Sequence, residues 1–69
     1  MTVREFLESA EYIDANVIIF DENDRALYQY EGFSVNDPDC RLAEDVADRF
    51  IDFWLLNIDG LDVELKIYL

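Results

Sequence analysis

The last nine residues of the chain alternate between apolar and polar side chains. The apolar positions are Leu61, Val63, Leu65, Ile67 and Leu69. Because successive side chains of a strand point to opposite faces of a sheet, this pattern predicts a strand with one buried face over residues 61–69. The dipeptide directly before it, Asp59-Gly60, is typical of a two-residue hairpin turn. The end of the chain therefore requires a sheet.

The segment before this turn is compatible with two structures. Residues 50–58 can form a strand that pairs with residues 61–69. With Asp52 as the single mismatch, this strand places four apolar residues on the buried face of the last strand: Phe50, Trp54, Leu56 and Ile58. Alternatively, the helical period of the preceding residues continues through this segment, which predicts one long helix ending near Asn57. We favour a helix that ends near Asp48, followed by a hairpin, and keep the long helix as the alternative.

Two helices are predicted from start signals and apolar spacing. Thr2 and Glu5 have the spacing of a capping box, and the apolar residues that follow recur at helical intervals, so we expect a helix over about 2–12. Asp37-Pro38 is a typical start for the second helix, because Asp can cap and Pro suits the first helical position. The apolar stripe of this second helix consists of Leu42, Ala43, Val46 and Ala47.

Two further strands are predicted between these helices. Residues 16–20 and 26–30 are rich in β-branched, aromatic or aliphatic side chains, and a polar turn at 21–24 separates them. We expect Gly32 to end the second strand. The resulting order is α-β-β-α-β-β, or α-β-β-α-β with a long second helix. Either order predicts an α+β fold in which a small antiparallel sheet packs against two helices, and residues 1–69 form a single domain.

Composition excludes several classes of function. The chain has no histidine and only one cysteine, Cys40, so Ser-His-Asp and Cys-His catalytic arrangements cannot be built within one chain. Residues 21–24 resemble the start of a calcium loop, but Ala26 and Gly32 occupy the positions where an EF-hand requires Gly and Glu. We therefore predict no enzymatic activity, no catalytic residues, no cofactor and no metal site.

Charge defines the first candidate site. Seventeen acidic residues against five basic ones give a formal charge of -12, although 52% of the residues are hydrophobic. Such a chain should fold and present a strongly negative surface, which repels nucleic acid and attracts proteins that bind nucleic acid. The candidate partner-binding carboxylates lie in two groups: Glu44, Asp45, Asp48 and Asp52 around the second helix, and Asp21, Glu22 and Asp24 in the hairpin turn.

Apolar side chains define a second candidate site. If the helices cover one face of the sheet, the hairpin model leaves four residues on the opposite face, and these are Ile51, Phe53, Leu55 and Tyr68. An apolar patch on a small domain indicates a partner or a second copy of the chain. The alternative function is therefore a homo-oligomeric accessory module, such as a homodimer, in which charge serves solubility.

A family resemblance supports the first candidate. The segments Thr2–Leu7, Val17–Asp21 and Tyr30–Gly32, followed by the terminal alternating strand, resemble small acidic proteins carried by phages and mobile elements of Gram-positive bacteria. Some small acidic proteins of this kind act as anti-CRISPR or other anti-defence inhibitors. The resemblance implies no catalytic residue and no particular target. The acidic surface itself predicts a basic nucleic-acid-binding host protein as the partner, with no direct binding to nucleic acid. Charged residues near the N-terminus and short apolar runs predict no membrane association and a cytoplasmic location, in the host cell if the protein is phage-encoded.

Overall fold

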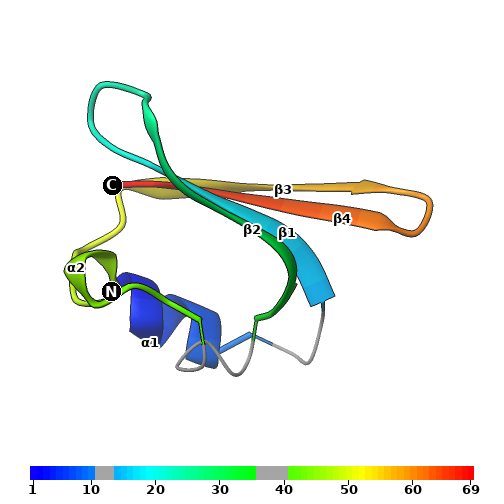
Figure 1. The fold of residues 1–69 in the computed structure, drawn as a ribbon, viewed down its shortest axis with the longest axis horizontal. Helices are drawn as coiled ribbons and strands as arrows, with labels where there is room; N and C mark the ends of the chain where they lie inside the picture. The colour runs from blue at the N-terminus through cyan, green and yellow to red at the C-terminus, as the bar shows by residue number, and fades with distance from the viewer. Residues whose placement is uncertain (11–13, 36–40) are drawn as a thin grey trace.

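The computed structural model describes residues 1–10, 14–35 and 41–69, which form a four-stranded sheet with two short helices on one side (Figure 1). The elements in chain order are α1 (Val3–Glu8), β1 (Asp14–Phe20), β2 (Ala26–Ser34), α2 (Glu44–Ala47), β3 (Phe53–Asp59) and β4 (Asp62–Tyr68). The predicted α+β class is confirmed, because the described residues contain both helices and a sheet.

The sheet is mixed, so the prediction of an antiparallel sheet is wrong. Its strand order is β2-β1-β4-β3, and the two central strands, β1 and β4, run parallel. Each hairpin is antiparallel within itself. After β2 the chain crosses to the opposite edge of the sheet and forms β3, and β4 then returns to the centre beside β1. The sheet therefore consists of two hairpins that share one parallel contact.

The hairpin of β3 and β4 settles the ambiguity of residues 50–58, because β3 is a strand and the long helix is wrong. The predicted turn was one residue too early. Asp59 pairs with Asp62, which leaves Gly60 and Leu61 as the two loop residues. Gly60 has φ +63°, and a type II′ turn requires glycine at this first position. The register moves by two residues, so the side chains of the paired residues in β3 and β4 keep their predicted faces.

Strand β2 continues through Gly32, which was predicted to end it. The pairing with β1 shifts between Ala15 and Val17, where two residues of β2 oppose Asn16. Gly32 has φ +57° and is the left-handed residue of this bulge, a conformation that glycine adopts without a Cβ clash. The Asn16 Oδ1 accepts a hydrogen bond from the Gly32 N–H at 3.3 Å. The glycine therefore bends the strand.

Helix α1 has the predicted capping box, but it is shorter than predicted. The Glu5 N–H donates to Thr2 Oγ1 at 3.2 Å, and the Thr2 N–H donates to Glu5 Oε1 at 3.0 Å. The helix ends at Glu8 with Ser9 as its C-cap, whereas the prediction extended it to about residue 12. Residues 11 and 12 lie outside the described part of the chain.

Helix α2 is a single turn, much shorter than predicted. Ala43 is extended, with φ -66° and ψ 136°, and no side chain caps the helix. Leu42 and Ala43, which were assigned to the helical stripe, therefore precede the helix. The predicted start at Asp37-Pro38 lies outside the described residues. Asp48 ends the helix, as expected.

The core lies between the two helices and one face of the sheet. Val17, Ile19, Leu65 and Ile67 alternate inward from the two central strands and meet Leu7 of α1 and Val46 of α2. All seven residues of β3 are exposed, because the helices cover little of that strand. Phe6 of α1 contacts this strand at Trp54, and the two ring centroids are 5.3 Å apart. None of the described helices is long and apolar enough to cross a membrane.

Candidate functional site

The two predicted acidic groups lie at the same end of the molecule (Figure 1). Arg49, just after α2, forms an ion pair with Glu22 of the β1–β2 turn, with Nη2 and Oε2 3.2 Å apart. The hydroxyl of Tyr28 on β2 donates to the Asp45 carboxylate of α2, at 2.8 Å from Oδ1 and 2.9 Å from Oδ2. The two groups therefore form one surface, the acidic end, which consists of Asp21, Glu22, Asp24, Glu44, Asp45, Asp48 and Asp52.

Helix α2 and the residues after it position the carboxylates of the second group. Glu44 and Asp48 are one helical turn apart and both are exposed. The Asp48 side chain is 85% exposed and lies 3.9 Å from Arg4 Nε. Asp52 is exposed just before β3, and its N–H donates to the Tyr68 carbonyl at 2.7 Å. This bond places Asp52 where β4 ends.

Asp21 holds the turn together. Its Oδ1 accepts hydrogen bonds from the backbone N–H groups of Asn23, at 2.8 Å, and Arg25, at 3.0 Å. Both bonds favour the ionised form of the Asp21 carboxyl and hold its pKa below the ordinary value, and the bond from the Arg25 N–H has the larger effect. Asp24 has φ 60° in the same turn, a conformation that Asp tolerates better than most residues. Asp21 therefore shapes the surface, while Asp24 is exposed on it.

Asp45 also has a structural partner. Its hydrogen bond to the Tyr28 hydroxyl raises the pKa of that tyrosine, because ionised Tyr28 would face a carboxylate. Tyr28 lies beside Tyr30 in β2, with ring centroids 6.0 Å apart, and Tyr30 is part of the core. Asp45 therefore links α2 to the core through the rings of Tyr28 and Tyr30.

Three arginines reduce the charge of the acidic end. Arg4, Arg25 and Arg49 lie among its seven carboxylates, which leaves a formal charge of -4. The other ten acidic residues of the chain are accompanied only by Arg41 and Lys66. The acidic end is therefore an ordered surface of mixed charge with a negative excess, and much of the net charge lies elsewhere.

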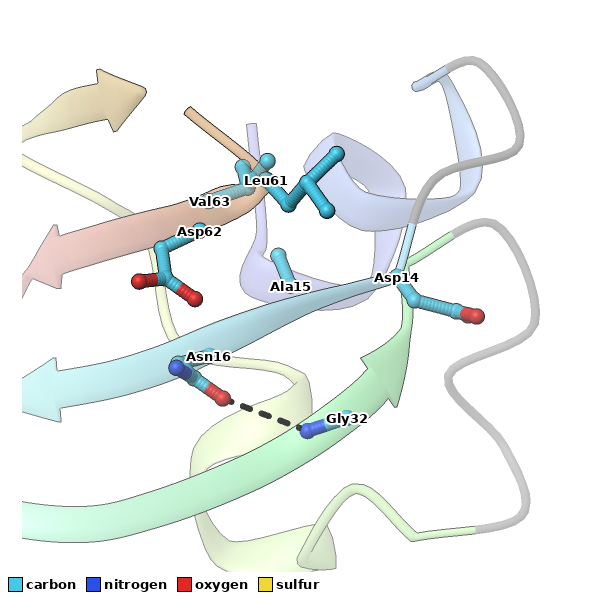
Figure 2. Close-up of a pocket in the computed structure, with 7 residues that line it drawn as sticks. All are labelled: Asp14, Ala15, Asn16, Gly32, Leu61, Asp62 and Val63. Atoms are coloured by element: carbon cyan, nitrogen blue, oxygen red, sulfur yellow. Dashed lines mark hydrogen bonds between the residues drawn. The ribbon is translucent and has the colours of Figure 1, made fainter. Parts of the chain in front are cut away.

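The opposite end of the sheet carries carboxylates that the sequence analysis did not select. An open pocket there is lined by Asp14 from β1 and Asp62 from β4, together with Ala15, Asn16, Gly32, Leu61 and Val63 (Figure 2). Figure 2 shows the two carboxylates pointing in different directions. Ser34 Oγ donates to Asp14 Oδ1 at 3.2 Å. The parallel contact of β1 with β4 brings these residues together, and no local sequence pattern predicts that contact.

The face of the sheet away from the helices carries three of the four predicted apolar residues. Phe20, Tyr68 and Phe53 form a row of stacked rings across β1, β4 and β3, with centroid distances of 4.7 and 4.3 Å. Leu55, on the same face as Phe53, pairs with Lys66. Ile51 does not belong to this patch, because it precedes β3, is half-buried and packs against the core on the helical side.

The chemistry available at the acidic end is that of a binding surface. Its carboxylates are exposed or engaged with arginine, tyrosine or backbone donors. Within the described parts of the chain, no three Asp, Glu, Cys or His residues are arranged so that they could hold a metal ion. Comparison of the chain with protein-family models, curated proteins and solved structures gave no match.

Proposed function

We propose that this chain is a non-enzymatic inhibitor that uses its acidic end to occupy the nucleic-acid-binding groove of a basic host protein, as an anti-CRISPR or other anti-defence protein would. The supporting observation is that the Arg49–Glu22 ion pair joins the β1–β2 turn to the segment after α2, while the Tyr28–Asp45 hydrogen bond holds α2 against β2. Two acidic groups that lie far apart in the sequence therefore share one surface. A groove built for phosphates presents Arg and Lys side chains, which carboxylates at a fixed position can engage.

The like charges on α2 lower the stability of the helix but suit it for binding a basic partner. Glu44 and Asp48 are like charges one helical turn apart, a spacing that costs roughly 0.2–0.5 kcal/mol in an isolated helix. Helix α2 has a single turn and no side-chain cap, so it has little intrinsic stability to offset this cost. A negative surface held by contacts to β2 and the turn loses little freedom when it binds, which favours affinity.

The net charge of -12 supports fast association with a basic partner. Long-range attraction raises association rates and falls steeply with ionic strength. The arginines within the acidic end hold its carboxylates in place at short range, whereas the whole chain provides the long-range field. The proposal therefore requires binding that weakens as salt increases.

The test is capture from a lysate of a Gram-positive bacterium on the immobilised chain, with elution by salt and, separately, by single-stranded DNA. We expect nucleic-acid-binding proteins to be captured at low salt and released by either treatment. The reversals Glu44→Lys and Asp48→Lys together should abolish the capture. Both carboxylates are exposed, and Asp48 faces another element only through its long, exposed ion pair with Arg4, so this variant should keep the fold.

The control carries the same charge change at another place. Glu8→Lys and Glu31→Lys together also alter the charge by four units, and both residues are exposed away from the acidic end. Glu5 is unsuitable as a control because its side chain completes the capping box of α1. Equal loss in the two double variants, or capture that added DNA does not reverse, would exclude the proposed site.

A further inference from the structure

The two edges of the sheet differ in how they are protected. Edge strand β2 has two register shifts relative to β1, and bulges of this kind disrupt pairing with another strand. Arg41 adds protection, because its Nη1 donates to the backbone carbonyl of Glu31 at 2.8 Å and approaches that of Gly32 at 3.5 Å. A further strand cannot easily extend the sheet on this side.

Edge strand β3 has none of these protections within its described residues. All seven of its residues, Phe53–Asp59, pair with β4 without a register shift, and all seven are exposed. Its first six residues, Phe53–Ile58, include no charge and no proline, which are the usual residues that prevent edge pairing. A long, regular, apolar edge is a template for another strand.

The position of the charges favours a second copy of this chain at that edge. A chain with a charge of -12 repels its own copies, so self-association is feasible only where the approaching surfaces are uncharged. Residues 53–58 provide such a segment. With two strands antiparallel and centred on Leu56, Asp59 lies opposite Phe53 of the second copy. The two Asp59 residues are then about 20 Å apart, well beyond the screening length at physiological salt. The nearest like charges are Asp59 and Asp52 of the other copy, and they meet only at the two ends of the paired segment.

The helical face of β3 is self-complementary in this register. Trp54, Leu56 and Ile58 are 46%, 48% and 61% exposed on that face. A two-fold axis perpendicular to the sheet places Leu56 opposite its own copy and Ile58 opposite Trp54 of the second copy. Phe6 of α1 covers β3 at Trp54. The Trp54 end of β3 in one copy therefore meets the Ile58 end of the other copy, which α1 leaves uncovered. The same pairing keeps the helices of both copies on one face.

We propose that two copies of this chain associate through antiparallel pairing of their β3 strands, centred on Leu56, to form one continuous eight-stranded sheet. The edge strands provide backbone hydrogen bonds, and Trp54, Leu56 and Ile58 of both copies form a shared apolar cluster. This interface differs from stacking of the open sheet faces, because Tyr68 lies outside it. Of the acidic end only Asp52 borders the paired segment, and the two sites are tested by changes at different residues, so each site can fail independently of the other.

Sedimentation of the purified chain across about 1 μM to 1 mM tests the dimer. We expect a species of twice the 8.1 kDa chain mass, and Leu56→Lys should raise the dissociation constant about tenfold or more because two lysines would meet at the axis. The matched control is Leu61→Lys on the same hairpin, where the side chain is fully exposed and outside the paired segment. Tyr68→Lys should also retain the dimer.

A cross-link provides an assay that does not depend on the folding of the lysine variant. In a Cys40→Ser background, Leu56→Cys should oxidise to a covalent dimer, because the two residues are directly opposite each other, whereas Leu61→Cys should not. A wild-type chain that stays monomeric to about 1 mM would overturn the proposal and leave a foreign strand as the occupant. Equal weakening by Leu56→Lys and Leu61→Lys, loss of the dimer in Tyr68→Lys, or equal cross-linking by the two cysteines would also overturn it.

Discussion

The hydroxyl of Tyr28 donates to the carboxylate of Asp45, which connects β2 to the single turn of α2 across the edge of the core. The two oxygen distances, 2.8 and 2.9 Å, show that the hydroxyl is centred on the carboxylate. A one-turn helix has little stability of its own, so its orientation depends on such contacts. This pair therefore controls where the acidic side chains of α2 point.

The Tyr28–Asp45 pair predicts a tyrosine that ionises at unusually high pH. Its pKa is raised chiefly by the hydrogen bond to Asp45, so Asp45→Asn should lower the pKa toward the ordinary value. Because the folded-state pKa is raised, the contribution of Tyr28 to stability is complete below the unfolded pKa and is lost as pH rises through the folded pKa. Carbon-13 NMR of labelled tyrosine rings measures the shift. Asp48→Asn is the control, and an unchanged pKa in Asp45→Asn would contradict the assignment.

Asp21 predicts a loss of stability in acid. Its folded-state pKa is lowered, chiefly by the hydrogen bond from the Arg25 N–H, so its contribution is present above the unfolded pKa and is lost as pH falls through the folded pKa. Asp21→Asn keeps an acceptor but removes this titration. We expect the variant to be less stable at neutral pH and to depend less on pH below about 4, as measured by urea unfolding. Parallel pH curves for variant and wild type would refute this role.

Gly60 predicts a conformational cost for any substitution that adds a Cβ. No atom lies within 4 Å of an ideal Cβ at this position, so the cost comes from φ +63° and not from crowding. Gly60→Ala should reduce the free energy of unfolding by about 1 kcal/mol, and Gly60→Asn by less, because Asn adopts the left-handed region more readily. Urea unfolding measures both. Alanine behaving like wild type would show that the turn differs from the one described.

Arg41 predicts a stabilising effect that lysine cannot replace. Its guanidinium lies 5.6 Å from the ring centroid of Tyr30 and 5.8 Å from that of Phe33, while it donates to the Glu31 carbonyl. Arg41→Ala should cost about 1 kcal/mol in the free energy of unfolding. Arg41→Lys should recover little of it, because an ammonium lacks the planar group that stacks and donates at once. If Arg41→Lys recovered the full free energy of unfolding, the positive charge alone would explain the effect of Arg41.

The local pattern predicted β1, β2 and β4 and left β3 open between a strand and a long helix, and it did not predict how the strands assemble. The alternation ending at Leu69 predicted β4, since a period of two reports one buried face. The parallel contact of β1 with β4 joins segments almost fifty residues apart, and neither strand carries a mark that selects its neighbour. The length of α2 was overestimated because Leu42 and Ala43 are apolar at helical spacing, yet they pack against the core from an extended segment.

The sequence identified most residues of the candidate site but did not predict how they are arranged in space. The acidic residues could be identified because they cluster in the sequence. The two groups meet through contacts of Arg49 and Tyr28, and no sequence pattern marked either residue as a contact. The prediction of Ile51 on the open face assumed that β3 starts near Phe50. In the structure Phe50 instead bridges to Thr2, and this contact turns Ile51 toward the core.

If the acidic end competes with nucleic acid for one groove, the chain must displace nucleic acid from the captured protein, and a displacement titration measures this. A protein captured by the chain is first bound to a fluorescent single-stranded oligonucleotide, and the chain is then titrated into the complex while anisotropy is recorded. We expect anisotropy to fall to the value of the free oligonucleotide. For competition at one site, the midpoint of this fall should increase linearly with the oligonucleotide concentration. The double variant Glu44→Lys and Asp48→Lys should leave the anisotropy high. Binding of the wild-type chain with no fall in anisotropy would contradict the account, because chain and oligonucleotide would then occupy separate sites.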